Sequence, residues 1–284
     1  MAEAELPEGF AEHRAGGATL IAATEHLPAL VKQGLDRAVE GIFNLEPAGA
    51  EGRGRGSTAR IPLGDGTRAR IKQMRRGGVL GPLWRDRFRP GRRLLDNLRV
   101  PLAALARGVA TARPVALWVV IGPPGLCRAW LATEEIEGAC DLAHRIAGGN
   151  APTPVEVDAV VSLVRAMHDR GIDHRDLNLG NLLLADPGPG APRAFVIDLD
   201  RARIRPGPLG PRARMRALRR LERSAVKLFG ARPVEGFDLR SRLYEAYAAN
   251  EPRWVGLAER AQRANRLSIA LHRLGWFRAP GRGE

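Results

Sequence analysis

The first half of the chain alternates short apolar runs with glycine-containing turns, a pattern typical of β-strands. Gly64-Asp65-Gly66 carries the Asp-Gly signal of a hairpin turn between two of these runs. Strands are predicted over residues 18–22, 59–63, 67–74, 115–121 and 126–133. The N-terminal part of the chain is therefore expected to form an antiparallel sheet.

Beyond residue 137 the apolar positions follow a helical period instead. Thr153, Pro154 and Glu156 form a helix start in which threonine caps, proline takes the first helical position and glutamate completes a capping box. One apolar stripe follows, made of Val157, Val160, Val161, Val164 and Met167. The pattern is helical again, and rich in arginine, from Pro211 onward. A further helix is predicted over residues 92–107, interrupted by Pro101.

These patterns predict an α+β chain of two lobes. Residues 1–136 are expected to form an antiparallel-sheet lobe and residues 137–284 a helical lobe, with a connector near residues 134–138. The chain has 284 residues, of which 44% are hydrophobic, so it is long enough to bury a substantial core.

The charge is strongly positive. Lys and Arg number 45 against 31 Asp and Glu, which gives a net charge of +14 and indicates an anionic partner. The basic residues are nearly all arginine and are dense over residues 68–93 and 201–227, where they would suit phosphate or carboxylate groups or an anionic membrane surface. A generally basic surface of an arginine-rich proteome is the competing interpretation. Only 5% of the residues are aromatic and no recognised module is present, so nucleic acid is not the expected partner.

The cysteine content and the apolar runs bear on where the protein works. Cys127 and Cys140 are too few for a disulfide framework or a metal cage, so a reducing cytosol is expected. The N-terminus is acidic and shows no signal peptide. The longest apolar stretch, residues 114–121, is far shorter than the ~20 residues of a membrane-spanning helix. Any membrane contact is therefore expected to be peripheral.

The strongest motif lies within residues 168–184. His174-Arg175-Asp176-Leu177 is followed by Asn181, and the apolar run at residues 195–200 contains Asp198. Phosphoryl transfer needs an acid that accepts the proton of the acceptor hydroxyl, a role that fits Asp176. It also needs oxygen ligands for Mg²⁺, and Asn181 and Asp198 supply them. Asp and Asn are common in loops for turn formation alone, but this order and spacing match the kinase signature. His168 and His174 are interpreted as structural braces.

A glycine-rich segment upstream is a candidate nucleotide-binding loop. Glycines let backbone N–H groups close over phosphates, and the candidates are Gly52, Gly54, Gly56 and Ser57. Lys72 lies on the return strand of the hairpin that follows, where it is expected to pair with the α- and β-phosphates. A flexible turn and a solvated strand lysine are the alternatives.

With these residues in place, the chain resembles the lipopolysaccharide kinase family, which includes the kinases of 3-deoxy-D-manno-octulosonic acid (Kdo) and of heptose. The resemblance runs from the glycine loop to about Arg201 and is carried by residues 54–58, 74–78, 174–183 and 197–201. Residues 133–139 also look like the lobe connector of this family, which implies that Glu134 and Ile136 hold the adenine edge.

The resemblance implies a bilobal protein-kinase-like fold with ATP and Mg²⁺ as cofactors. The expected acceptor is a sugar hydroxyl, that of Kdo, in a lipid A–linked core. The expected location is cytoplasmic, peripheral on the inner face of the inner membrane, with no obligate protein partner.

Two features bear on the alternatives. Few residues separate Asp198 from the helix at Pro211, and no A-P-E element follows, so little chain is left for a peptide-binding platform. The helix after the strand lysine contains no glutamate, and Asp96 is its only acid. The short segment after Asp198 favours a small or sugar acceptor over a protein, and the missing glutamate motivates the alternative of a lipid-binding pseudokinase. A protein or small-metabolite kinase on the same fold is the other alternative.

Overall fold

The computed structural model describes residues 5–37, 58–75, 86–123, 125–185, 191–229 and 239–249, and four positions beyond them, Trp254, Gly256, Glu259 and Arg263. The chain divides into two compact units, residues 1–137 and 138–284, and each is described by itself. That the first unit binds nucleotide and the second is catalytic stays a prediction.

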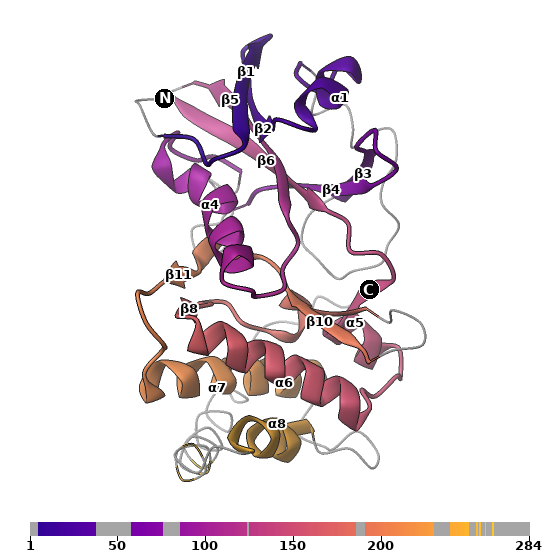
Figure 1. Cartoon of the computed structure of the whole chain (residues 1–284), viewed down its shortest axis with the longest axis vertical. Coiled ribbons are helices and arrows are strands. Elements are labelled where there is room, and N and C mark those ends of the chain that lie inside the picture. Colours follow the sequence, from indigo (N-terminus) through magenta and orange to yellow (C-terminus); the bar gives the residue numbers. More distant parts are fainter. Residues whose placement is uncertain are drawn as a thin grey trace, which may run out of the picture. The chain divides into compact units, whose positions relative to one another are not determined.

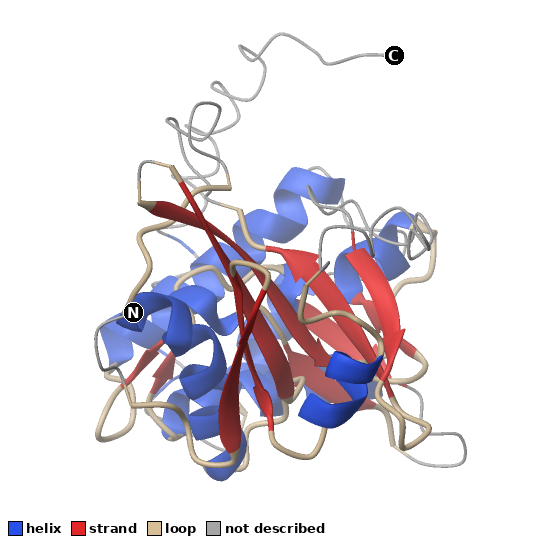
Figure 2. Ribbon diagram, turned by 90° about the horizontal axis from the view of Figure 1, so that it is seen from above, coloured by secondary structure: helices blue, strands red, loops and turns tan. Residues whose placement is uncertain are grey.

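The first unit contains a six-stranded antiparallel sheet, whose strands are drawn in red in Figure 2. Its strand order is β1 (Phe10–Ala15), β2 (Ala18–Ala23), β5 (Pro114–Gly122), β6 (Leu126–Glu134), β4 (Arg68–Gln73) and β3 (Thr58–Pro62). The five predicted strands are confirmed within a residue or two of their limits. Strand β1 was not predicted because its apolar and polar residues do not alternate, and most of its side chains are only half-buried.

Each face of this sheet packs on its own apolar cluster. One cluster contains Ala59, Ala69 and Ile71 and includes Leu30 of the short helix α1 (Leu27–Lys32). Trp118 in this cluster donates its indole N–H to the carbonyl of Leu35 at 2.8 Å. The opposite cluster contains residues of β2, β5, β6 and the helix α4 (Arg92–Ala106).

Helix α4 runs through Pro101, so the expectation that this proline interrupts the helix was wrong. A proline in a helix interior costs about 3 kcal/mol. Leu94, Leu95 and Leu98 are fully buried against β5 and β6, and each contributes about 1.5–3 kcal/mol. Because the apolar contacts outweigh the missing backbone hydrogen bond, the helix continues. Figure 1 shows α4 beside the sheet.

The second unit is mainly helical. Its helices are α5 (Leu142–Ala147), α6 (Pro154–Asp169), α7 (Pro211–Phe229) and α8 (Leu239–Ala248), with α6 and α8 in contact (Figure 1). The short strands β7 (Ala139–Asp141), β9 (Leu182–Ala185) and β10 (Arg193–Val196) form one antiparallel sheet, and β8 (Ile172–Asp173) pairs with β11 (Arg203–Ile204). The 3₁₀ turns η2 (Leu179–Asn181) and η3 (Leu199–Arg201) complete the unit.

Helix α6 confirms the predicted capping box. Thr153 accepts a hydrogen bond from the backbone N–H of Glu156, and the Glu156 carboxylate accepts one from the N–H of Thr153. The whole predicted apolar stripe of α6 is buried. Among the residues that the structure describes, no helix combines the length and apolarity needed to cross a bilayer.

Candidate active site

The predicted catalytic loop connects β8 to η2 and is held by its own side chains. Asp176 is exposed on this loop. Its carbonyl oxygen accepts hydrogen bonds from Nδ2 of Asn178 at 2.8 Å and from Nδ2 of Asn181 at 2.9 Å. Oδ1 of Asn178 in turn accepts from the N–H of Gly180 at 2.9 Å. The backbone that carries Asp176 is therefore fixed while its carboxylate faces solvent.

His174 braces the loop, as predicted. Its Nδ1 accepts the N–H of Asp176 at 3.2 Å, so its Nε2 carries the proton and donates to the carbonyl of Ile197 at 3.1 Å. Burial lowers the pKa of His174, although the nearby carboxylates of Asp198 and Asp176 act in the opposite direction. A neutral imidazole with both nitrogens engaged is a structural link rather than a proton carrier.

Asp198 has an unusual backbone conformation. Its φ of 64° and ψ of 50° lie in the left-handed region, and among the described residues it is the only non-glycine residue with positive φ. Such conformations cost of order 1–3 kcal/mol and gather at functional sites, where the surrounding structure enforces them. The N–H of the preceding residue, Ile197, donates to the carbonyl of Asn181 at 2.9 Å. Asp198 is thus tied to the loop of Asp176 and Asn181.

The donors of this loop suit Mg²⁺. Because Nδ2 of Asn181 is used for the bond to Asp176, its Oδ1 remains as the atom for a cation. Together with the carboxylate of Asp198 it would provide two oxygen ligands, and Mg²⁺ takes one or two from protein while keeping waters and phosphates. The described residues contain no cluster of three or more His, Cys, Asp or Glu side chains of the kind that holds a transition metal.

Helix α7 supports the loop through a contact that the sequence did not indicate. Oγ of Ser224 accepts the N–H of Leu179 at 3.2 Å, at the start of η2. Arg220 lies one helical turn earlier and therefore on the same side of α7. Its positive charge acts on His174 and contributes to lowering the pKa of that residue, after burial.

In the first unit, Lys72 lies on β4 as predicted. Ile71 packs in the cluster that contains Ala59, so the side chain of Lys72 lies on the opposite face of the strand. Leu131, its neighbour on β6, packs in the cluster of α4. Lys72 therefore shares the face of the sheet that α4 covers. Asp96, the acid on α4, is half-buried.

The connector begins at the end of β6. The N–H of Glu134 donates to the carbonyl of Arg113, and the N–H of Glu135 donates to that of Arg68, both at 2.8 Å. Ile136 follows outside any strand, and its backbone groups have no backbone partner among the described residues. That Ile136 binds the edge of a ligand stays a prediction. The predicted glycine-loop residues, Gly52, Gly54, Gly56 and Ser57, lie outside the described residues.

Three comparisons with known proteins bear on this site. The sequence model of the lipopolysaccharide kinase (Kdo/WaaP) family matches residues 48–247. A 3-deoxy-D-manno-octulosonic acid kinase of Xanthomonas euvesicatoria pv. vesicatoria (strain 85-10) is 34% identical over 208 residues, which cover 71% of this chain and 78% of that protein. The enzyme with the same name from Xylella fastidiosa (strain M12) is 34% identical over 201 residues, covering 68% and 76%.

A solved structure described as WaaP in complex with acyl carrier protein has a similar fold. It is 22% identical, superposes with a TM-score of 0.50, and the match covers 87% of this chain and 98% of that one. The first unit is strand-rich and carries Lys72 on a strand. The second unit is helical and carries Asp176, Asn181 and Asp198 in the order of the kinase signature. These features define a phosphotransferase of the protein-kinase-like class. The family match and the sequence identities then fix its membership: the chain belongs to the lipopolysaccharide kinase (Kdo/WaaP) family. The predicted α+β fold and the predicted kinase activity are confirmed.

Proposed function

We propose that the protein transfers the γ-phosphoryl group of ATP to a hydroxyl of Kdo in the lipopolysaccharide inner core. The observation that carries this proposal is the braced loop, in which His174 and Asn181 bind the backbone of Ile197 and so keep Asp176, Asn181 and Asp198 on connected segments. The names of the relatives in Xanthomonas and Xylella support the choice of Kdo.

In the proposed reaction, Asp176 accepts the proton of the acceptor hydroxyl. The hydroxyl oxygen forms a bond to the γ-phosphorus while the bond between that phosphorus and the bridging oxygen breaks, so ADP leaves. Mg²⁺ held by Asn181 and Asp198 would offset the charge of the triphosphate. The residues proposed to bind ATP are Gly52, Gly54, Gly56, Ser57, Lys72, Glu134 and Ile136.

The arginines of α7 support an anionic acceptor. Arg220 lies near His174, and burial together with the charges of Arg219 and Arg220 lowers the pKa of Arg223. Guanidinium groups suit phosphate and carboxylate groups, so these arginines would suit an anionic acceptor. We propose that they meet the negative groups of a lipid-linked sugar, with the protein lying on the inner face of the inner membrane. No protein partner is part of this proposal.

The proposal is tested with Asp176→Asn, which keeps the shape of the side chain and removes its basicity. Turnover of ATP with Kdo-bearing lipid A is expected to fall at least ~100-fold, because positioned proton transfer contributes 10²–10⁴-fold. Transfer of labelled phosphate to the lipid measures it. Asp158→Asn, at an exposed position on α6, is the matched control.

Retained turnover in Asp176→Asn would remove Asp176 from its role. Label found on protein and never on lipid would favour the alternative of a protein kinase. Absence of any ATP turnover in the wild type would favour a pseudokinase.

A further inference from the structure

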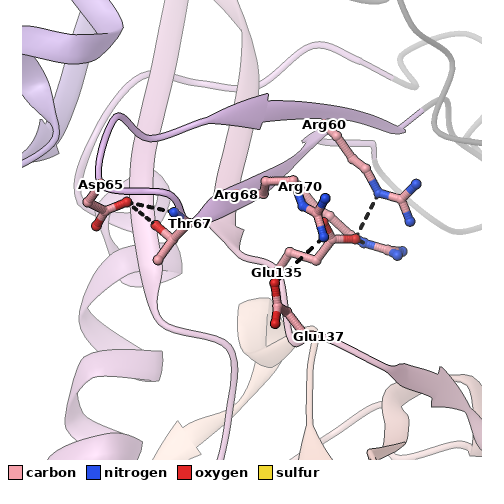
Figure 3. A network of polar contacts seen from close by, with 7 residues as sticks. All are labelled: Arg60, Asp65, Thr67, Arg68, Arg70, Glu135 and Glu137. Carbon is pink, nitrogen blue, oxygen red and sulfur yellow. Dashed lines mark hydrogen bonds and ion pairs between the residues drawn. The ribbon is translucent and has the colours of Figure 1, made fainter.

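Three arginines of the first unit converge on one carboxylate, as Figure 3 shows. Nε of Arg60 on β3 and Nε of Arg70 on β4 donate to Oε1 of Glu135 at 2.8 and 2.9 Å. Nε of Arg68 lies 3.2 Å from Oε2 of the same carboxylate. The Glu135 side chain is only 6% exposed, whereas those of Arg60 and Arg70 are each 38% exposed. The carboxylate is thus enclosed by guanidinium groups that themselves reach solvent.

The Glu135 carboxylate of this cluster is ionised at neutral pH. Burial alone would raise the pKa of Glu135, but the hydrogen bonds from Arg60 and Arg70 outweigh it and hold the pKa below its usual range. Each of these two arginines uses Nε for Glu135, which orients its planar guanidinium group. Within the described residues, no further acceptor engages either of them.

The position of the cluster links two parts of the proposed nucleotide site. Arg70 precedes Lys72 by two residues on β4, so both side chains lie on the same face of the strand. Arg60 is directly opposite Arg70 in the β3–β4 ladder. Glu135, which holds both, is the residue before Ile136. A nucleotide with its phosphates at Lys72 and its base edge at Ile136 would therefore pass over Arg70, with Arg60 beside it on the edge strand β3.

We infer that the guanidinium groups of Arg60 and Arg70, which Glu135 holds through their Nε atoms, form the surface on which the nucleotide base stacks. The inference rests on the proposed function, because it takes ATP as the donor. Guanidinium planes stack on aromatic rings, whereas a lysine ammonium is a compact point charge. Because Glu135 offsets part of their charge, these arginines are better suited to the base than to the triphosphate.

The test compares a ligand that has a base with one that has none. The dissociation constants of ADP and of inorganic tripolyphosphate are measured by calorimetry for the wild type, Arg70→Lys and Arg60→Lys. Each substitution keeps the positive charge and removes the plane. ADP binding is expected to weaken about tenfold, and tripolyphosphate binding to change less than twofold.

Controls separate stacking from other effects. Arg14→Lys makes the same exchange on β1, at the opposite edge of the same sheet, and is expected to leave both constants unchanged. Thermal melting of each variant checks that the fold is intact. Glu135→Gln, which loosens both arginines without changing them, is expected to weaken ADP binding and to spare tripolyphosphate.

Two results would overturn the inference while leaving the proposed function intact. In one, ADP and tripolyphosphate lose affinity by the same factor, which would make the cluster a phosphate site. In the other, neither ligand changes affinity. Wild-type protein that binds no ADP would instead contradict the proposed function itself.

Discussion

At the scale of single residues, Gly171 has little freedom to change. It precedes the catalytic loop with φ of +77°, and a Cβ atom there would lie 2.5 Å from the carbonyl oxygen of Gly207 and 2.7 Å from that of Arg205. The N–H of Arg205 donates to the carbonyl of Gly171 at 2.8 Å, so the close approach belongs to the β8–β11 pairing. Only glycine fits both the conformation and the space.

Gly171→Ala is therefore expected to destabilise the protein by roughly 2–4 kcal/mol, through strain in φ and a backbone clash. Gly149→Ala is the matched control, because Gly149 has φ of +84° and no atom within 4 Å of an added Cβ. It should cost only about 1 kcal/mol. Urea denaturation measures both, and equal losses would show that the clash at Gly171 is relieved at little cost.

The residues of the candidate site were predictable to different degrees. Asp176, Asn181 and Asp198 follow from sequence spacing, because the chemistry needs these residue types in this order. Glu135 was missed, since its partners Arg60 and Arg70 are ten positions apart and meet only through the pairing of β3 with β4. Arginines at alternate positions of both strands were the available signal. The role of Ser224 could not be predicted from the sequence, because its contact with Leu179 is a tertiary one.

At the scale of secondary-structure elements, α7 combines support of the catalytic loop with positive charge. Arg220→Ala and Arg223→Ala are each expected to raise KM for the lipid acceptor about tenfold and to leave KM for ATP unchanged, because a charged contact contributes roughly 1.5–3 kcal/mol. Arg212→Ala, exposed at the start of the same helix, is the control. Steady-state kinetics at fixed salt measures this, and an equal rise of both KM values would contradict it.

The elements themselves were largely predictable from local pattern. The capping box of α6 and the hairpin turn before β4 are short-range features, and the side chain of Asp65 indeed accepts hydrogen bonds from Thr67 (Figure 3). Helix α4 shows the limit of such rules. The prediction that Pro101 interrupts the helix considered only the missing backbone hydrogen bond. The apolar contacts that keep the helix intact are made with strands distant in the sequence.

At the scale of the whole molecule, buried histidines make stability depend on pH. Burial lowers the pKa of His168 to about 3, and its Nδ1 lies 2.8 Å from the hydroxyl of Tyr247. The pKa of His174 is also lowered by burial. The unfolded chain takes up protons below about pH 6.5 while the folded chain does not, so stability is present above that pH and falls as the pH decreases.

From pH 7 to pH 5, His168 alone is expected to remove about 2 kcal/mol of unfolding free energy. His168→Gln should lessen this pH dependence, although the variant is less stable at pH 7. His144→Gln, at an exposed position, should leave the dependence unchanged. Urea titrations at the two pH values measure it, and identical pH dependence in wild type and His168→Gln would contradict the assignment.

At Ile197 the link between the loop and Asp198 uses only peptide groups, since its N–H donates to Asn181 and its carbonyl accepts from His174. A peptide carbonyl is common to all twenty amino acids, and a peptide N–H to every one except proline. Descendants of this gene can therefore exchange the side chain at that position and still inherit the link. At position 197 natural selection can therefore preserve a constraint without fixing the side chain, apart from the exclusion of proline, although the link also needs the imidazole of His174.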